Sequence, residues 1–473
     1  MSLKQFVLKN YTRIECWILI FFLIRFIGIT NPPLEISHNW RQTTGLMVAR
    51  NFLEVDPSIF YARIDDNSGG TGIIGIEFPS MNYVYFLMAK IFGYTHWYGR
   101  LINLIVSSFG LFYFYKLLQQ ARFKERLAFY ATLFLTVSIW FSFSRKMMPD
   151  TYCISLMFIG LFFGLKYLEE QKIRQLLLYT FFCSLAILSK IPAGIYLVVL
   201  APFLLNAKYT IKSRFLLATL TLIPLALMFW WYFIWNPHVS ATYGNWYNSG
   251  RQLLVGMNEI FSHPIETLDN FYFDAFFSFV TFGLFLVGLV LMFVDRQKSM
   301  IIAFFSVFIV FVVYIFKSGY FFYHHSYYII PFVPVMALVA AYALLKIQQK
   351  WLFYLVFFFC MVESIANQQH DFFIKSAEKY KLTIEPIMNK LSKRNDLIVL
   401  NGNFNPQMIY LSHRKGWNCS DDQLLNPSYI SGLSASKCKF VVIDKHASVD
   451  LNQLKLPFKK VFENDDFLIF SIH

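Results

Sequence analysis

Charged residues beside apolar segments are the first candidates for chemistry in this sequence, because a charge at the edge of a bilayer is costly unless it has a role. Most lysines and arginines lie in short loops at one set of segment ends. A smaller set of charged residues stands at the opposite ends and comprises Arg100, Arg145, Lys146, Lys190 and Lys317 with the acidic Asp150, and Arg25 lies in the outer half of its segment. Several cations at one membrane depth predict a site for an anionic head group such as a lipid phosphate. The alternative for each of them is a side chain that only snorkels to lipid headgroups.

An aromatic stretch follows Lys317 and adds further candidates. Its residues His324, His325 and Tyr328 stand between two apolar segments, where they can contact a phosphate or its head group. Packing at the membrane interface explains them equally well. The sequence leaves both interpretations open.

The segment after the first apolar run carries groups that can move a proton. His38 follows that run, Asp65 and Asp66 lie in a turn-rich acidic stretch, and Glu77 precedes an apolar helix, while Arg41 beside His38 is a candidate for substrate binding. A histidine or a carboxylate is a suitable general base for a hydroxyl group. The alternatives are that Glu77 caps the following helix and that His38 hydrogen-bonds its own loop.

The composition indicates that lipid is the solvent for most of the chain. Of the 473 residues, 57% are hydrophobic, 15% are charged and 20% are aromatic, which suits helices that contact acyl chains and headgroups. The net charge of +14 is spread over short loops between apolar runs, as in a protein that follows the positive-inside rule. This distribution argues against a nucleic-acid partner.

Tracing the basic loops through a bilayer predicts about eleven transmembrane helices with a cytoplasmic N-terminus. The predicted spans are 14–30, 97–117, 126–144, 149–168, 174–189, 191–206, 214–235, 274–294, 299–316, 326–345 and 351–367. Residues 31–96 and 236–273 then become long outer loops. Within the first loop, residues 40–52 have a helical pattern, and residues 79–94 are expected to form a helix at the outer interface, because they are short and polar for a crossing.

The chain is expected to have two domains, a membrane domain at 1–367 and a small α/β domain at 368–473 on the outer side. Short apolar runs bounded by polar residues predict buried strands at 397–400, 440–443 and 467–470. Residues 374–394 predict a helix. Whether Cys419 and Cys438 form a disulfide depends on the redox state of their compartment, and the sequence leaves this open.

The order of these features resembles that of GT-C-fold glycosyltransferases, and in particular the superfamily of protein O-mannosyltransferases and aminoarabinose transferases. The matching features are the long first outer loop with its interfacial helix, Arg100 at the start of the second span, an Arg-Lys-x-x-Pro-Asp turn at 145–150, a Leu-Ser-Lys-x-Pro turn at 188–192 and a His-Ser-Tyr-Tyr-x-x-Pro-x-x-Pro stretch at 325–334. The resemblance covers residues 14–345. Each motif alone is weakly specific, and their order carries the resemblance.

The resemblance implies an inverting transfer of a sugar from a polyprenyl-phosphate donor to a hydroxyl group of a protein, lipid or glycan acceptor. Basic residues would hold the leaving phosphate, and a first-loop carboxylate would serve as the base. Where the relatives have Asp-Glu after the first span, this sequence has His38-Asn39, whereas Arg41 matches the arginine that follows. Glu77 matches an acidic position before the interfacial helix and is the first candidate for the base. His38 is the second, and Asp65 or the adjacent aspartate is the third.

The remaining expectations concern metal, location and alternative functions. No Asp-x-Asp motif occurs in either outer loop, so we expect a mechanism without metal or cofactor. The expected location is a cell membrane of the bacterial inner-membrane type, crossed several times, with the C-terminal domain extracytoplasmic. The alternative function is a transporter or flippase of a lipid-linked or anionic substrate, and a polysaccharide polymerase or ligase would use the same lipid. Polar residues gathered at the outer surface favour interfacial chemistry over passage through the membrane.

Overall fold

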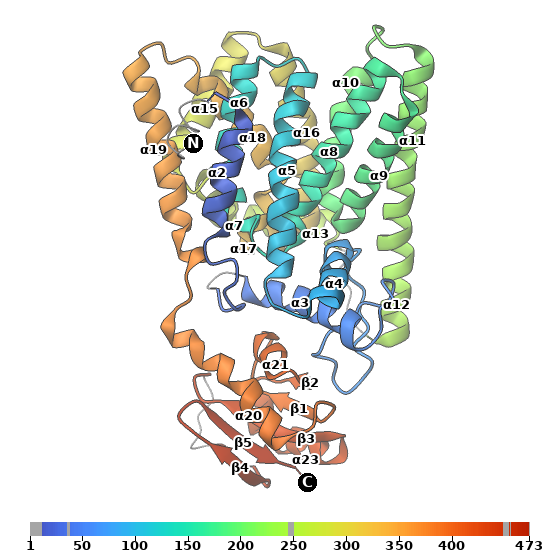
Figure 1. Ribbon diagram of the computed structural model, residues 1–473, viewed down its shortest axis with the longest axis vertical. Helices are drawn as coiled ribbons and strands as arrows, with labels where there is room; N and C mark the ends of the chain where they lie inside the picture. Colours follow the sequence, from blue (N-terminus) through green and yellow to red (C-terminus); the bar gives the residue numbers. More distant parts are fainter. Residues whose placement is uncertain (1–11, 36–37, 245–249, 448–453, 455, 473) are drawn as a thin grey trace. The chain divides into compact units, whose positions relative to one another are not determined.

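The computed structural model describes residues 12–35, 38–244, 250–447, 454 and 456–472, and the chain divides into two compact units (Figure 1). The first, the helical unit, comprises Met1–Ile29, Gly99–Trp235 and Asn248–Phe372. The second, the loop–sheet unit, comprises Thr30–Tyr98, Asn236–Tyr247 and Phe373–His473. The first outer loop and the C-terminal domain therefore belong to one compact unit, although most of the helical unit separates them in the sequence.

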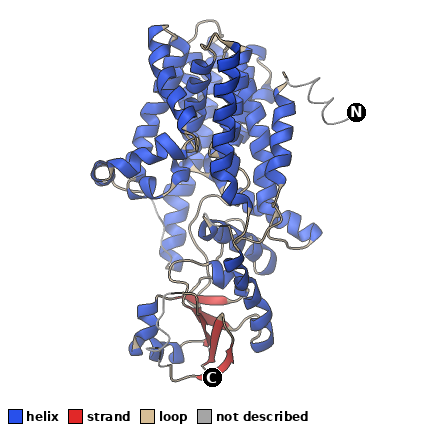
Figure 2. Ribbon diagram, turned by 90° about the vertical axis from the view of Figure 1, so that its left-hand side faces the viewer, coloured by secondary structure: helices blue, strands red, loops and turns tan. Residues whose placement is uncertain are grey.

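The helical unit is built from apolar helices, and the described strands are confined to the C-terminal domain (Figure 2). Its α-helices are α2 (Ile14–Phe26), α5 (Tyr98–Gln120), α6 (Glu125–Val137), α7 (Trp140–Phe143), α8 (Pro149–Glu170), α9 (Ile173–Ser189), α10 (Ala201–Leu204), α11 (Ile211–Phe229), α13 (Leu253–Ser262), α14 (Pro264–Asp269), α15 (Phe279–Val294), α16 (Lys298–Ser318), α17 (Tyr320–His324), α18 (Val333–Leu344) and α19 (Lys350–Gln368). Helical turns of other pitch connect them, namely η1 (Ile191–Leu200), η2 (Trp230–Trp235), η3 (Asn270–Asp274), η4 (Ser326–Ile329) and η5 (Gln369–Phe372).

Each predicted span contains a helix, but the count of eleven spans is not confirmed. In the described part of the chain, five helices are long and apolar enough to cross a bilayer, and a bent pair would make six. The five are Tyr98–Gln120, Pro149–Glu170, Ile211–Tyr243, Lys298–Ser318 and Lys350–Leu391, and the pair is Pro264–Asp274 with Phe279–Val294, bent by 98°. The other predicted spans contain shorter helices, such as α2 and α6 with 13 residues each, whereas a straight crossing needs about 20.

Small residues allow close packing inside the helical unit. A Cβ atom on Gly110 of α5 would lie 2.2 Å from the Cβ of Ser155 on α8, and one on Gly288 of α15 would lie 2.2 Å from the carbonyl oxygen of Val339 on α18. Helix pairs in membranes approach closely at such positions. All residues of α18 are buried, so this helix lies in the interior of the unit.

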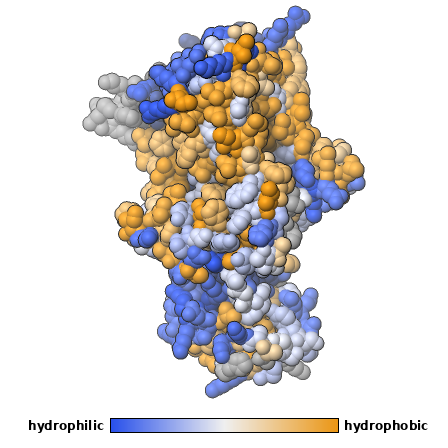
Figure 3. All heavy atoms as spheres, turned by 90° about the vertical axis from the view of Figure 1, so that its right-hand side faces the viewer, coloured by the Kyte–Doolittle hydropathy of each residue, from blue (hydrophilic) through white to orange (hydrophobic). Residues whose placement is uncertain are grey.

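Large apolar side chains cover the flank of the helical unit, as Figure 3 shows for the face that carries α9 and α11. Phe181, Phe215 and Leu222 are among the exposed residues of these helices, and Phe358 is exposed on α19. An apolar surface of this extent is suited to acyl chains and not to water. The protein is therefore a multi-pass membrane protein.

The loop–sheet unit combines helices from distant parts of the sequence. The first outer loop contributes α3 (Asn39–Glu54) and α4 (Ser80–Phe92), which confirms both helices predicted there. The other helices are α12 (Asn236–Tyr243), η6 (Ser376–Thr383), α20 (Ile384–Leu391), α21 (Gln407–Ser412), α22 (Asp421–Leu425) and α23 (Pro427–Ala435). The predicted helix at 374–394 thus forms as η6 and α20. That α4 lies at a membrane interface stays a prediction.

A five-stranded sheet forms the centre of the C-terminal domain. Its strands are β1 (Leu397–Leu400), β2 (Lys415–Asn418), β3 (Cys438–Asp444), β4 (Lys459–Glu463) and β5 (Phe467–Ser471), in the order β2-β1-β3-β5-β4. Strands β2, β1 and β3 are parallel, and β5 runs antiparallel to β3 and β4. The three predicted strands are confirmed as β1, β3 and β5. The sequence analysis missed β2 and β4, because both are edge strands with few apolar residues.

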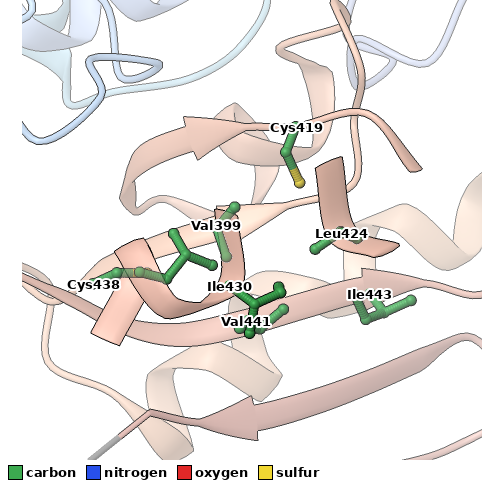
Figure 4. Packing of buried hydrophobic residues seen from close by; sticks show 8 residues of the cluster. Val399, Cys419, Leu424, Ile430, Cys438, Val441 and Ile443 are labelled. Atoms are coloured by element: carbon green, nitrogen blue, oxygen red, sulfur yellow. The ribbon is translucent and has the colours of Figure 1, made fainter. Parts of the chain in front are cut away.

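The core of this domain packs against β1 and β3 (Figure 4). Val399 and Val441 on the strands contact Leu424 and Ile430 on the helices that cover them, and Leu433 and Ile443 belong to the same cluster. Cys419 and Cys438 also lie in this core as free thiols. Burial raises the pKa of each thiol to about 12, so both are protonated and unreactive at neutral pH.

Candidate functional site

Four basic residues are buried inside the helical unit. The exposed fractions of Arg25, Arg100, Arg145 and Lys146 are 0%, 1%, 1% and 1%. Buried charges are rare unless a partner or a ligand balances them. The sequence analysis selected all four from their position at the ends of apolar segments, and burial excludes that they merely reach outward to lipid headgroups.

Arg25 of α2 is surrounded by uncharged hydrogen-bond partners in the described part of the chain. Its Nη1 donates to the Ser144 hydroxyl at 2.7 Å, its Nη2 to the Ser108 hydroxyl at 3.3 Å and its Nε to the Phe21 carbonyl at 3.0 Å. Arg145 lies within electrostatic range. These dipoles solvate the guanidinium without neutralising its charge, so the charge can act on an anion.

The turn before α8 is organised by Asn103, a residue that the sequence analysis missed. The Nδ2 of Asn103 donates to the carbonyl oxygens of Phe143, Lys146 and Met148 at 3.0, 2.8 and 3.1 Å. Its Oδ1 accepts from the Thr151 hydroxyl at 3.0 Å. One buried amide thus fixes both sides of the turn that carries Arg145 and Lys146, and only the three-dimensional structure reveals this.

The segment after α19 meets the same turn. Lys146 Nζ lies 2.9 Å from Asp371 Oδ2, and both side chains are buried. Arg145 donates to the Asp371 carbonyl at 3.4 Å and to the Ile27 carbonyl at 2.7 Å, and its guanidinium lies 3.9 Å from the centre of the Phe372 ring. Asp371 was also missed, although an acidic residue soon after an apolar run is a usable signal. The contacts join three distant segments around Arg145 and Lys146.

Asp150 and Lys190 form an ion pair, so the structure brings the two predicted turns together. Pro149 begins α8, which places Asp150 in the first turn of the helix, where the helix dipole favours a carboxylate. Lys190 follows the last residue of α9, and its Nζ lies 4.9 Å and 5.5 Å from the ring centres of Tyr327 and Tyr328.

The aromatic stretch divides into two groups. His325 stacks on Tyr327 with ring centres 5.2 Å apart, and burial, with the nearby charges of His324 and Lys190, lowers the pKa of His325 to about 4. It is therefore neutral at physiological pH and acts as a polar group, not as a cation.

Lys317 and His324 belong to the second group. Lys317 Nζ donates to the carbonyl oxygen of Arg251, and Arg251 pairs with Glu259 at 3.2 Å. The His324 ring lies 3.9 Å from that of Tyr320, whose backbone N–H donates to Glu259. Lys317 and His324 thus have contacts within this second group, whereas Lys190, His325 and Tyr328 have contacts within the first.

In the loop–sheet unit, Arg41 and Glu77 are brought together. Arg41 Nη2 lies 2.5 Å from Glu77 Oε1, and the two side chains are 27% and 25% exposed. Glu77 is therefore a partly accessible carboxylate whose charge is balanced by an arginine. His38 stands at the start of α3 with a φ of 63°, in the left-handed region. The N-cap of α4 is Pro79, without a side-chain cap.

Asp65 and Asp66 are deeply engaged in other contacts. Asp65 Oδ2 lies 2.6 Å from Arg50 Nη2, and both side chains are 4% exposed. The Oδ1 of Asp65 accepts from Asn51 Nδ2 at 2.9 Å. Asp66 accepts from the backbone N–H and the side-chain amide of Asn418 at 3.2 and 2.9 Å, and burial raises its pKa above the usual value.

The comparison with known structures finds the same architecture over almost the whole chain. ArnT from Cupriavidus metallidurans in the apo state has a TM-score of 0.64 and 12% identity, with 97% of this chain and 98% of that chain covered. The same protein bound to undecaprenyl phosphate gives 0.62 and 13%, with the same coverage. The oligosaccharyltransferase of Archaeoglobus fulgidus, tethered with an acceptor peptide, gives 0.55 and 13%, with 93% of this chain and 70% of that chain covered.

The chain has the GT-C glycosyltransferase fold. The model of the dolichyl-phosphate-mannose-protein mannosyltransferase family also matches, over residues 78–233. The resemblance inferred from the motifs is therefore confirmed. A comparison with curated protein sequences finds no match.

The matched range shows where the family resemblance and the site coincide. Arg100, Arg145, Lys146, Asp150 and Lys190 lie within residues 78–233, and Glu77 directly precedes it. Within the described residues, no group of three or more His, Cys, Asp or Glu side chains could hold a metal ion.

Proposed function

We propose that this GT-C protein transfers a sugar from a polyprenyl-phosphate donor to a hydroxyl acceptor at the outer face of the membrane, with inversion at the anomeric carbon. The observation that carries the proposal is the pair of buried guanidinium groups of Arg25 and Arg145, which lie within electrostatic range of each other beside the Lys146–Asp371 ion pair. Buried charges of one sign are expensive, and a phosphate that enters among them offsets this cost. The undecaprenyl phosphate bound to ArnT, a protein of the same fold, supports a lipid phosphate as the anion.

The proposed reaction exchanges one bond at the anomeric carbon for another. The acceptor oxygen attacks that carbon from the side opposite the phosphate, and its proton passes to a base. The glycosidic C–O bond breaks, and its electron pair leaves with the phosphate, whose negative charge grows. Preplaced cations stabilise that growing charge more in the transition state than in the ground state, which lowers the barrier.

Glu77 is the proposed base, and Arg41 is proposed to keep it ionised and oriented. A neighbouring guanidinium favours the carboxylate form, and a partly exposed side chain leaves room for an acceptor. His38 remains the second candidate. Asp65 is less suited, because both of its oxygens already accept hydrogen bonds from buried side chains. No metal is part of this mechanism.

The remaining predicted residues are assigned to binding. Lys190, Asp150 and Tyr328 are proposed to contact the donor head group together with His325, while Arg100 contributes to the phosphate site. Lys317 and His324 are proposed to bind nearer its periphery. The N-terminus is proposed to be cytoplasmic and the C-terminal domain extracytoplasmic, which reporter fusions at each end test directly.

The experiment compares binding and turnover in purified protein in nanodiscs. Undecaprenyl phosphate is the binding probe, and mass spectrometry of outer-surface glycoconjugates in a deletion strain identifies the sugar and its acceptor. Arg145→Lys should weaken binding of the probe at least about tenfold, because a lysine cannot form the paired contacts of a guanidinium. Arg174→Gln, a change at an exposed basic residue at the start of α9, is the matched control.

Glu77→Gln should lower transfer by about 10²–10⁴-fold and leave binding of the probe unchanged, since it removes the proton acceptor and the charge paired with Arg41 but no group assigned to the phosphate. Wild-type transfer by this variant would exclude Glu77 as the base. A deletion strain with unchanged glycoconjugates but impaired movement of a lipid-linked sugar would favour the flippase instead.

A further inference from the structure

The first outer loop joins the sheet of the C-terminal domain through its backbone. The N–H of Gly416 on the edge strand β2 donates to the Asp65 carbonyl at 3.0 Å. The Gly416 carbonyl in turn accepts from the N–H groups of Asn67 and Ser68 at 2.9 and 2.8 Å. The loop thereby pairs in parallel with β2 at Asp66. Such pairing covers an otherwise open sheet edge and fixes the loop to it.

Only glycine fits at the junction. Gly416 has a φ of +149°, and a Cβ atom there would lie 1.8 Å from the carbonyl oxygen of Ile398 on β1. On the loop side, a Cβ on Gly69 would meet the ring of Trp417 at 3.0 Å. The loop and the edge strand β2 therefore pack so closely at Gly69 and Gly416 that a single added methyl group would not fit without a shift.

Arg50 of α3 is the second connection. Besides its ion pair with Asp65, both of its terminal nitrogens donate to the Tyr410 carbonyl at 3.1 Å, and its guanidinium lies 4.3 Å from the centre of the Tyr410 ring. The Tyr410 hydroxyl lies 2.6 Å from that of Tyr94 and 2.7 Å from His96 Nδ1. Tyr410 belongs to α21, and its exposed fraction is 1%. A buried polar network therefore joins the loop to the domain.

The same helix leads from this network to Glu77. Arg41 and Arg50 are nine residues apart on α3, which corresponds to about 13.5 Å along the axis and about 180° around it. One face of the helix holds Glu77 through Arg41, and the opposite face is held by Asp65 and Tyr410. Asn82 of α4 donates to the Gly45 carbonyl of α3 at 2.7 Å, so the segment after Glu77 is also tied to this helix.

We infer that the C-terminal domain positions the carboxylate of Glu77, with Arg50, Asp65 and Tyr410 as positioning residues that act through α3. The assignment of catalysis to Glu77 rests on the proposed function, whereas the mechanical coupling does not. Displacement of a catalytic group by about 1 Å can cost about 100-fold in rate. A domain far away in the sequence thus sets the geometry of the first loop.

The decisive experiment compares Asp65→Leu with the double variant Arg50→Met plus Asp65→Leu in the full-length protein. The single variant leaves a buried guanidinium without its carboxylate, whereas the double variant replaces the ion pair by apolar side chains of similar size. We expect the single variant to lose about 100-fold in turnover at saturating substrate with unchanged undecaprenyl phosphate binding. The double variant should recover only in part, because it no longer contains an unpaired buried charge but still lacks the two hydrogen bonds from Arg50 to the Tyr410 carbonyl.

Hydrogen–deuterium exchange provides a readout that does not depend on activity. Asp65→Leu should increase exchange at residues 74–82, and the double variant should restore part of the protection. Val441→Ala weakens the core of the C-terminal domain on β3, two strands from the junction strand β2, and is the control for a purely structural effect. It should lower the melting temperature without changing exchange at 74–82. Tyr410→Phe removes one hydroxyl, and it should raise the same exchange even if Asp65→Leu does not fold.

Three results would overturn the inference. They are an inactive but folded double variant, which would make Asp65 itself catalytic, unchanged exchange at 74–82 in the single variants, and an equal increase in Val441→Ala. If the exchange changes as expected while Glu77→Gln transfers sugar normally, the coupling holds and the proposed base is wrong. The two hypotheses therefore fail separately.

Discussion

Asn103→Leu tests whether the turn at 143–148 is held in place in order to bind a lipid phosphate. The substitution approximately keeps the side-chain volume but removes the amide that donates to three carbonyl groups of the turn at 2.8–3.1 Å. Asn103 is 0% exposed, so water cannot replace the lost contacts at the surface. The turn should then relax, and Arg145 and Lys146 with it.

The structure sets the size of the effect. An amide group has two protons, so at most two of the three contacts are full hydrogen bonds at one time. Each buried carbonyl that loses its partner costs about 1–3 kcal/mol, so the free energy of unfolding should fall by about 2–6 kcal/mol. If one charge-assisted contact to the phosphate is lost as the turn relaxes, about 1.5–3 kcal/mol of binding energy is lost. That corresponds to a dissociation constant about 10–100-fold higher.

The assay measures undecaprenyl phosphate binding in nanodiscs alongside thermal unfolding. Asn206→Ala, at an exposed loop position, serves as the control and should change neither quantity. A variant with a lower melting temperature but wild-type affinity would refute the link between the turn and the phosphate. Unchanged values for both would show that the amide contacts contribute nothing, and the energetic reasoning would be wrong.

Three further predictions concern other parts of the chain. Lys190→Gln should weaken undecaprenyl phosphate binding by about tenfold, the loss of one charge-assisted contact, as measured by the same binding assay. Gly416→Ala should detach the first loop from β2, because its Cβ would collide with the Ile398 carbonyl, and faster proteolysis within residues 60–72 would report this. The hydrogen bond from His413 lowers the pKa of Glu385 to about 2, so the contact should stabilise the C-terminal domain at neutral pH and lose its effect as pH falls from about 4.3 towards about 2. His413→Gln should therefore lower the free energy of unfolding at pH 7 by under about 1 kcal/mol, because Glu385 is well exposed, and have little effect at pH 2. Thermal unfolding at the two pH values measures this.

The helices and the positions of the cations could be predicted from the sequence, because both depend on the free-energy cost of placing nearby residues in lipid. An apolar run of sufficient length predicts a helix in lipid. A charged residue at the end of such a run is energetically costly, so it indicates a position with a structural or functional role. Arg100 and Arg145 are two such positions, and both side chains are buried in the structure. The count of eleven crossings stays unconfirmed, because hydropathy does not show where a helix such as α6 ends after 13 residues.

Long-range partners were beyond the sequence for a different reason. Asp371 contacts Lys146 across more than two hundred residues, and Tyr410 contacts Arg50 across 360. The sequence around Asp371 or Tyr410 does not indicate which residue either of them contacts. The edge strand β2 was missed as well, because Lys415-Gly416-Trp417-Asn418 lacks an apolar alternation and is completed by pairing with the first loop.

Arg50 and Arg25 are both buried arginines, but their partners distinguish a structural role from a role in binding. The charge of Arg50 is neutralised by Asp65, so Arg50 links the first loop to the C-terminal domain and is not available to bind an anion. Arg25 is bound by hydroxyl and carbonyl dipoles in the described part of the chain, which orient its charge but do not cancel it. Burial alone does not distinguish the two, and neither does the sequence. The charge of the partner does, because in the proposed reaction only a cation whose charge is not neutralised can stabilise the leaving phosphate.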